Sequence, residues 1–320
     1  MRVLTGIQAS GKLHIGNYFG AMKPMIELQE HNELFTFIAN YHSLTSSTSS
    51  ELLRQYTHDA ALDYLAIGID PNKTTFWVQS HVPEVMELYW ILSKFTPMGL
   101  LERAHSYKDK VAKGIPANHA LFSYPVLMAA DILILDTGKV PVGKDQIQHI
   151  EITRDIATKF NNEYGDIFVI PEYIVSDEVA TIIGIDGDKM SKSYGNTIDM
   201  FMEEKALQKQ CNKIVTSSTP MGEPLDWNGC NLYNLCSLFL DNEGRLGLQE
   251  RYKSGLEGYG HFKKHLKELI WSEFAEAREK RAYYEAKPKI VAEILANGAS
   301  KARVIAKAKL EIVKSAVGLI

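Results

Sequence analysis

Short apolar segments alternate with helical patterns along the first part of the chain, and this alternation restricts the fold more than any other feature of the sequence. Residues 3–5, 34–39 and 74–79 are rich in β-branched and aromatic side chains, as buried strands are. A helical pattern over 51–67 separates the last two and stops at Gly68. The alternation predicts an α/β fold with a doubly wound parallel sheet and helices on both faces. Ligands of such a sheet bind at the carboxyl ends of its strands, near the point where the strand order reverses.

The rest of the chain extends this pattern and then departs from it. Extended segments are predicted over 132–135 and 139–142, and helices over 84–94, 145–164 and 119–131, the last interrupted at Pro125. Beyond residue 193 a loop over 219–231 precedes a long stretch, 248–314, of helix-forming Ala, Glu, Lys, Leu and Arg. We therefore place a boundary near residue 195.

Composition limits the class of protein. The 320 residues, at 36.0 kDa, suffice for two domains, and 45% hydrophobic and 23% charged residues are typical of a globular protein. The sequence contains no uncharged apolar run of the roughly 20 residues that a membrane span needs. The first six residues lack the apolar core of a secretory signal, and three cysteines do not make a disulfide framework. These observations predict a cytoplasmic protein that does not enter a membrane.

The charge is unevenly distributed. The net charge is −4, but residues 1–200 carry 16 Lys and Arg against 24 Asp and Glu, a balance of −8. Residues 251–320 carry 15 against 8, a balance of +7. A basic tail of this kind is typical of a protein that contacts a polyanion. A solvated helix face would have the same composition, so charge alone leaves both interpretations open.

A glycine-rich segment follows the first predicted strand. Residues 6–12 match the phosphate-binding pattern G-x-x-x-x-G-K, but that loop needs Ser or Thr next to hold Mg²⁺, and Leu13 has no oxygen. What remains is a turn from strand to helix, with His14 and Asn17 on one helix face. Backbone N–H groups at a helix start favour an anionic phosphate, and these two side chains add donors. Taken alone, a histidine at a helix start is more often structural.

A second candidate segment is Lys189-Met190-Ser191-Lys192-Ser193, which follows a glycine- and aspartate-rich turn. Two lysines on a loop can place positive charge where negative charge develops during phosphoryl-region chemistry. The alternative is a solvated basic turn.

Together these two segments resemble the signature sequences of the class I aminoacyl-tRNA synthetases. Most of that class have a second histidine at the position of Asn17. In carrying Asn there, the chain resembles the tryptophan enzymes of bacteria and organelles. The resemblance covers essentially the whole chain, including residues 128–133 and 140–149. Ala9 departs from the proline that is usual there, and this change removes no functional group. The resemblance implies a Rossmann-type catalytic domain and an all-helical C-terminal domain.

A third segment, residues 124–131, carries a carboxylate among apolar residues. Tyr124, Met128 and Asp131 lie on one helix face at positions i, i+4 and i+7. A buried carboxylate needs a partner, and an indole presents one N–H donor on an otherwise apolar ring. The residues alone leave open whether Asp131 binds such a ligand or pairs with a group of the protein. The resemblance implies the first.

The resemblance implies residue roles. Transition-state charge is stabilised by His14, Asn17, Lys110, Lys189 and Lys192. ATP is bound by Gln8, Ala9, Ser10, Gly16, Asn17, Gly143, Lys144, Asp145, Ile182, Lys189, Met190, Ser191, Lys192 and Ser193. Tryptophan is bound by Leu4, Gly6, His42, Tyr124, Met128, Asp131, Val140, Val142 and Gln146.

It also implies organisation, activity and partners. Residues 1–188 form the catalytic domain, with a basic insertion at about 99–117, and residues 189–196 form the lysine loop. Residues 197–320 form a mostly helical region that binds the tRNA anticodon, with the last helix able to pack back on the catalytic domain. The implied reaction joins L-tryptophan to tRNA-Trp and uses ATP and Mg²⁺. The resemblance implies that the ion is held mainly by phosphates and that the protein is a homodimer.

Three cysteines, Cys211, Cys230 and Cys236, lack the four-cysteine pattern of some relatives, so we expect no iron–sulfur cluster and no protein metal site. Two alternatives stay open: the related tyrosine enzyme, and a non-catalytic paralogue that binds RNA or has a regulatory role.

Overall fold

The fold is built on a five-stranded sheet, seen in a computed structural model that describes residues 1–45, 49–104, 107–108, 118–175 and 182–320. All its neighbouring strands are parallel, which confirms the predicted fold class. The order is β3-β2-β1-β4-β5, and the strands are β1 (Arg2–Ile7), β2 (Glu33–Ile38), β3 (Thr74–Val78), β4 (Lys139–Pro141) and β5 (Glu172–Ile174). The short and partly exposed β5 was not predicted, because its three residues have no apolar pattern.

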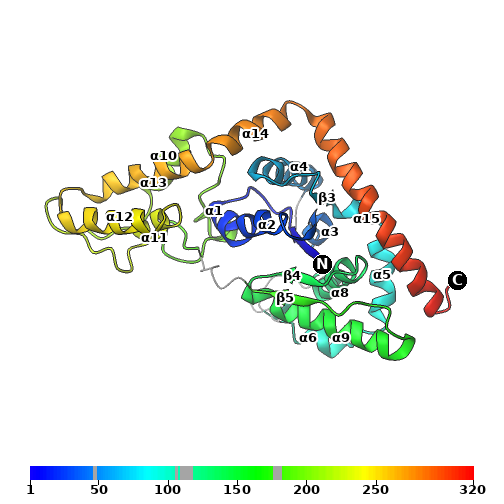
Figure 1. Cartoon of the computed structure of the whole chain (residues 1–320). Helices are drawn as coiled ribbons and strands as arrows, with labels where there is room; N and C mark the ends of the chain where they lie inside the picture. The colour runs from blue at the N-terminus through cyan, green and yellow to red at the C-terminus, as the bar shows by residue number, and fades with distance from the viewer. Residues whose placement is uncertain (46–48, 105–106, 109–117, 176–181) are drawn as a thin grey trace.

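Alternate side chains of the sheet enter two different cores, as the two-residue period of a strand requires. Val3, Leu34 and Phe76 belong to one apolar cluster, and their neighbours Leu4 and Phe35 belong to the other. Helices cover both faces in Figure 1. Within the described part of the first 165 residues, the structure has the helices and helical turns α1 (Ile15–Asn17), η1 (Tyr18–Met22), α2 (Lys23–Leu28), α3 (Asn40–Ser43), α4 (Ser50–Ile67), η2 (Gln79–His81), α5 (Glu84–Ser93), α6 (Met98–Glu102), α8 (His119–Leu133), η3 (Lys144–Gln146) and α9 (Ile147–Tyr164).

The strand order places a switch point between β1 and β4. The chain moves outward from β1 through β2 to β3 and then returns to the other side of β1 as β4. The segments that leave Ile7 and Pro141 therefore separate to opposite sides, and a crevice opens between them at the carboxyl edge of the sheet.

Two local predictions about α8 were wrong. The helix continues through Pro125 without a break, because its buried position is stabilised by packing and the ring removes a single hydrogen bond. Residues 132–135, predicted as extended, instead form the end of this helix, which stops at Leu133, and the turn that follows it. A short apolar run cannot be assigned to strand or buried helix from periodicity.

The helix α4 agrees with its prediction: Ser49 accepts from the Leu52 N–H at its start, and Gly68, at φ +119°, ends it.

Helices make up most of the C-terminal part. They are α10 (Glu204–Asn212), α11 (Asn231–Ser237), α12 (Asn242–Ser254), α13 (Tyr259–Glu273), α14 (Ala275–Glu285) and α15 (Pro288–Ala316), and a short turn, η4 (Lys192–Tyr194), precedes them. In Figure 1, α10 to α13 lie together beside the sheet, α14 crosses to α4, and α15 runs along β3. At Gly298 of α15 an added Cβ would lie 1.8 Å from the carbonyl oxygen of Phe76. The glycine therefore allows the helix backbone to touch the edge strand and cover it.

Candidate active site

Two adjoining cavities open at the carboxyl edge of the sheet. The larger has a volume of about 850 Å³ and the smaller about 500 Å³. Both are lined by Gln8, which follows β1, and by Gly143, which follows β4. Ala21 and Gln146 are also shared. The cavities therefore lie at the switch point, where the sequence predicts the ligands, and a molecule in one can meet a molecule in the other.

The larger cavity collects most of the residues predicted to bind ATP. They are Gln8, Ser10, Gly16, Asn17, Gly143, Lys144, Asp145, Ile182, Lys189, Met190, Ser191 and Lys192, together with His14. Ala9 and Ser193, among the described residues, line neither cavity; Ala9 has its side chain in the core instead, 2% exposed. Lys110 and most of the predicted insertion lie outside the described residues.

The glycine-rich turn brings His14 and Asn17 to the start of α1. His14 precedes the first helical residue in an extended conformation, and its backbone N–H donates to Asn17 Oδ1 at 3.1 Å. Its ring folds against Gly16, where an added Cβ would lie 2.8 Å from Nδ1. That nitrogen is buried and has no hydrogen-bond partner within the described part of the chain. The ring is therefore positioned by packing at the cavity wall and not by a hydrogen bond through Nδ1.

The lysine loop closes onto the glycine turn. Lys192 Nζ donates to the carbonyl oxygen of Gly11 at 2.9 Å, a contact between residues 181 positions apart. Asn196 shapes this loop from inside: its Oδ1 accepts from the Ser191 N–H at 2.8 Å, and its Nδ2 donates to the Lys189 carbonyl at 3.1 Å. Asn196 is 2% exposed. It was not predicted as a site residue, because its role depends on a loop conformation that the sequence does not display.

Burial changes the protonation of two groups in the larger cavity. It lowers the pKa of His14 to about 4, and the charge of Lys192 adds to this effect. Burial also lowers the pKa of Lys192 to about 8, opposed by Asp199 and Asp63. At neutral pH His14 is therefore uncharged and can take part in hydrogen bonds. Lys192 is mostly protonated and positively charged at this pH, which lies only about one unit below its pKa.

The smaller cavity brings together all nine residues predicted to bind tryptophan. They are Leu4, Gly6, His42, Tyr124, Met128, Asp131, Val140, Val142 and Gln146. Further lining comes from Thr5, Phe37, Ala39, Thr45, Ile132 and Pro141, which the sequence did not single out. Four of them, Thr5, Phe37, Ala39 and Pro141, lie in or directly after observed strands that were predicted, so their strand positions could have indicated them. Hydrocarbon and aromatic side chains dominate the wall, which fits a flat apolar ring.

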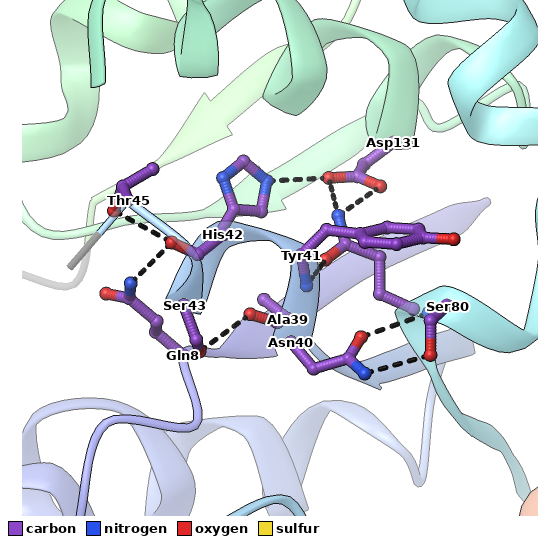
Figure 2. Close-up of polar contacts among 10 residues, drawn as sticks. Gln8, Ala39, Asn40, Tyr41, His42, Ser43, Thr45, Ser80 and Asp131 are labelled. Carbon is purple, nitrogen blue, oxygen red and sulfur yellow. Dashed lines mark hydrogen bonds and ion pairs between the residues drawn. The ribbon is translucent and has the colours of Figure 1, made fainter. Parts of the chain in front are cut away.

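Asp131 is the buried carboxylate of this cavity, 5% exposed. Its Oδ2 lies 2.9 Å from His42 Nε2, and Gln79 Nε2 donates to Oδ1 and Oδ2 at 2.9 and 2.8 Å. Figure 2 shows His42 and Asp131 pointing toward each other from α3 and α8. The carboxylate therefore pairs with groups of the protein and also lines the cavity, so the pairing is observed and the binding of a ligand stays a prediction.

Tyr124 and Met128 lie on the same face of α8 as Asp131, as their spacing predicts. The Tyr124 hydroxyl lies 2.7 Å from Nε2 of His149, which is buried in α9. Its ring meets the ring of His42 edge-on, with centroids 6.3 Å apart. The aromatic wall is thus tied to two neighbouring elements.

A metal site made by the protein is not apparent in the described part. There, no group of three or more His, Cys, Asp or Glu is placed to hold an ion. Cys211, Cys230 and Cys236 are free, and burial raises the pKa of the Cys211 thiol to about 12. The described helices include none that is long and apolar enough to cross a membrane.

Comparison with known proteins gives matches over the full chain. The family of "tRNA synthetases class I (W and Y)" matches residues 1–275. A protein of Campylobacter jejuni named tryptophan–tRNA ligase is 60% identical over 319 residues, which cover 100% of both chains. A protein of the same name from Fusobacterium nucleatum is 52% identical, covering 100% of this chain and 98% of its own.

Solved structures give the same result. The tryptophanyl-tRNA synthetase of Campylobacter jejuni, crystallised with ADP and tryptophan, superimposes with a TM-score of 0.95 over 99% of this chain and 100% of its own. The Mycoplasma pneumoniae enzyme, 28% identical, gives a TM-score of 0.83 over 99% and 97%. A tyrosyl-tRNA synthetase of Archaeoglobus fulgidus, at 18% identity and a TM-score of 0.68, shares the fold.

Proposed function

The chain belongs to the class I tRNA synthetases for tryptophan and tyrosine, and from this premise we propose that it is a tryptophan–tRNA ligase. It activates L-tryptophan with ATP to tryptophanyl-adenylate and pyrophosphate, and then transfers tryptophan to the 3′ end of tRNA-Trp. Relatives that are 60% and 52% identical bear this name, and one was crystallised with ADP and tryptophan.

The observation that carries the proposal is the contact between the two cavities. An amino acid whose ring lies against Asp131 has its carboxylate toward Gln8 and Gly143, the residues common to both cavities. ATP in the larger cavity then presents its α-phosphorus to that carboxylate. The amino acid itself is the nucleophile, so the protein contributes orientation and charge stabilisation.

The groups that stabilise charge surround the larger cavity. His14 and Asn17 offer polar atoms at a helix start, and Lys189 and Lys192 bring positive charge from the loop. Lys110 belongs to the same proposal through the resemblance. Mg²⁺ bound to ATP would neutralise phosphate charge. Asp145 contributes a single carboxylate to this cavity, which fits an ion held mainly by phosphate oxygens and water.

We also propose that the protein is a cytoplasmic homodimer that binds tRNA through its helical C-terminal region. The +7 balance of residues 251–320 favours contact with tRNA.

Trp90 and Met86, one turn apart on α5, are 76% and 39% exposed, and Leu44 shares a hollow with Met86. Such an apolar surface is typical of a subunit contact. Light scattering should give twice 36.0 kDa; a species of 36.0 kDa would refute the dimer.

The function is tested by ATP–pyrophosphate exchange with each of the twenty amino acids. Tryptophan alone should support exchange, and tRNA-Trp should then accept it. Exchange that depends on tyrosine would assign the other specificity of the family. A folded protein that binds tRNA but supports no exchange would be a non-catalytic paralogue.

A further inference from the structure

Behind Asp131 lies a glutamine that does not line the cavity. Gln79, in η2, is 1% exposed, and its amide nitrogen is within 2.9 Å of both carboxylate oxygens of Asp131. The described residues that line the smaller cavity include Asp131 and not Gln79. Gln79 is therefore not placed to contact a ligand in this cavity, and it acts through the groups that it contacts, of which Asp131 lines the cavity.

The orientation of the Gln79 amide is determined by the backbone. The Tyr41 N–H, which can only donate, points at Gln79 Oε1 at 3.0 Å. A flipped amide would set its NH₂ group against that N–H and its oxygen against the carboxylate. The hydrogen bonds thus run in one direction, from Tyr41 through Gln79 to Asp131, and the glutamine presents a donor to Asp131 in every stable arrangement.

Two hydrogen bonds join α3 and η2, the elements on either side of this contact. Asn40 Nδ2 donates to Ser80 Oγ at 2.8 Å, and the Ser80 N–H donates to Asn40 Oδ1 at 3.1 Å (Figure 2). This pair joins α3, which carries His42, to η2 next to Gln79. Asp131 therefore receives donors from two elements that cannot shift independently.

These donors leave a defined place for a ligand. The χ2 torsion of an aspartate is soft, so packing alone does not orient its carboxylate plane. Oδ2 accepts from both Gln79 and His42, which uses its two lone pairs, whereas Oδ1 accepts only from Gln79 among the described residues. One acceptor site on Oδ1 remains for an N–H donor.

We propose that Gln79 is a positioning residue that sets the selectivity of the site for an indole N–H by orienting the Asp131 carboxylate. The inference rests on the proposed function and names a residue on which its substrate selectivity depends. A site built to hold a hydrogen-bonding group discriminates strongly against analogues without it, provided that the partner is held in place.

Two substitutions separate the donor from the shape of the side chain. Gln79→Met has a side chain of similar length and removes all three hydrogen bonds, the two to Asp131 and the one from the Tyr41 N–H. Gln79→Glu keeps an acceptor for the Tyr41 N–H and turns an oxygen toward Asp131. The assay is exchange kinetics with tryptophan and with 3-(benzothiophen-3-yl)alanine, which has sulfur in place of the indole N–H.

In both variants kcat/KM for tryptophan should fall about ten- to a hundredfold, mainly through a higher KM. The values of kcat/KM for the analogue and of KM for ATP should stay within about threefold of those of the unsubstituted enzyme. The ratio of the two substrates is independent of the folded fraction, so poor folding cannot imitate this result. In Gln79→Glu, kcat/KM for tryptophan, expressed relative to the unsubstituted enzyme, should recover as pH falls from 8 to 6. At the lower pH the introduced carboxyl group and Asp131 share a proton, which restores a hydrogen-bond donor between them. Gln79→Met should show no recovery.

A matched control is Gln29, another buried glutamine with three hydrogen bonds, to Gly68, Asp70 and Thr74, that lines neither cavity. Gln29→Met should lower Tm and leave the substrate ratio unchanged. Equal losses for tryptophan and the analogue in the Gln79 variants, or no loss, would overturn the inference, as would a Gln79→Glu enzyme without recovery at low pH. Absence of tryptophan-dependent exchange in the unsubstituted enzyme would instead refute the proposed function.

Discussion

Lys192→Ala should slow adenylate formation far more than it weakens tryptophan binding. Lys192 reaches the glycine turn across the larger cavity and lies outside the smaller one. A lysine on a loop can bind charge that appears only in the transition state, and loss of one such donor typically costs on the order of 10²–10³ in kcat. ATP–pyrophosphate exchange measures the effect.

The pKa of Lys192 adds a pH dependence of definite sign. With a pKa of about 8, the amine is about 90% charged at pH 7 and about 10% charged at pH 9. The charged form is the low-pH form, so activity is lost as pH rises through 8. We expect kcat/KM for ATP, which reports the free enzyme, to fall about tenfold between pH 7 and pH 9. Bound phosphates raise the pKa of the amine, so kcat should decline at higher pH.

Lys192→Arg provides the contrast, because its guanidinium stays charged throughout this range. Its kcat/KM for ATP should be lower than normal and should lack the decline. Lys73→Ala, on the surface beside Glu30, controls for the general loss of a lysine and should behave as the unsubstituted enzyme. A flat profile to pH 9.5 in the unsubstituted enzyme would refute the reasoning, and so would a decline that persists in Lys192→Arg.

Three further changes test the site and the fold. Asp131→Ala should lower kcat/KM for tryptophan about ten- to a hundredfold in exchange assays, with KM for ATP within about threefold; an equal loss for the benzothiophene analogue would show that Asp131 only supports the pocket. Arg281→Met should cost on the order of 3 kcal/mol in urea denaturation, because Arg281 binds the buried Asp63 at 2.8 Å. Burial raises the pKa of Asp63 to about 6, so the loss should be smaller at pH 5, where this carboxyl is protonated, than at pH 8; equal losses would contradict this. Gly298→Ala should lower Tm by pushing α15 from β3, whereas Gly260→Ala, with free space around its Cβ, should not; equal Tm values would contradict the packing.

The sequence was sufficient for much of the local structure and for a prediction of the chemistry of the site. Apolar runs at β1, β2 and β3 and the capped helix α4 have periods and end signals that fewer than twenty residues can express. The alternation of these elements limits the sheet to a parallel, doubly wound form, and that form predicts where ligands bind. The glycine turn and the lysine loop are local patterns as well, so His14 and Lys192 could be identified before any contact between them was known.

Only the tertiary structure decided which distant groups meet. Gln79 and Asp131, 52 positions apart, and Lys192 and Gly11, 181 apart, share no local pattern that could announce their contact. Pro125 remains inside a helix because neighbouring elements bury most of α8 around it, and propensity is weak against that packing. A residue's local conformation depends mostly on its neighbours in sequence, whereas its hydrogen-bond partner depends on how whole elements pack. For this reason the sequence could identify Asp131 as a carboxylate in need of a partner, while Gln79 could be found only in the folded chain.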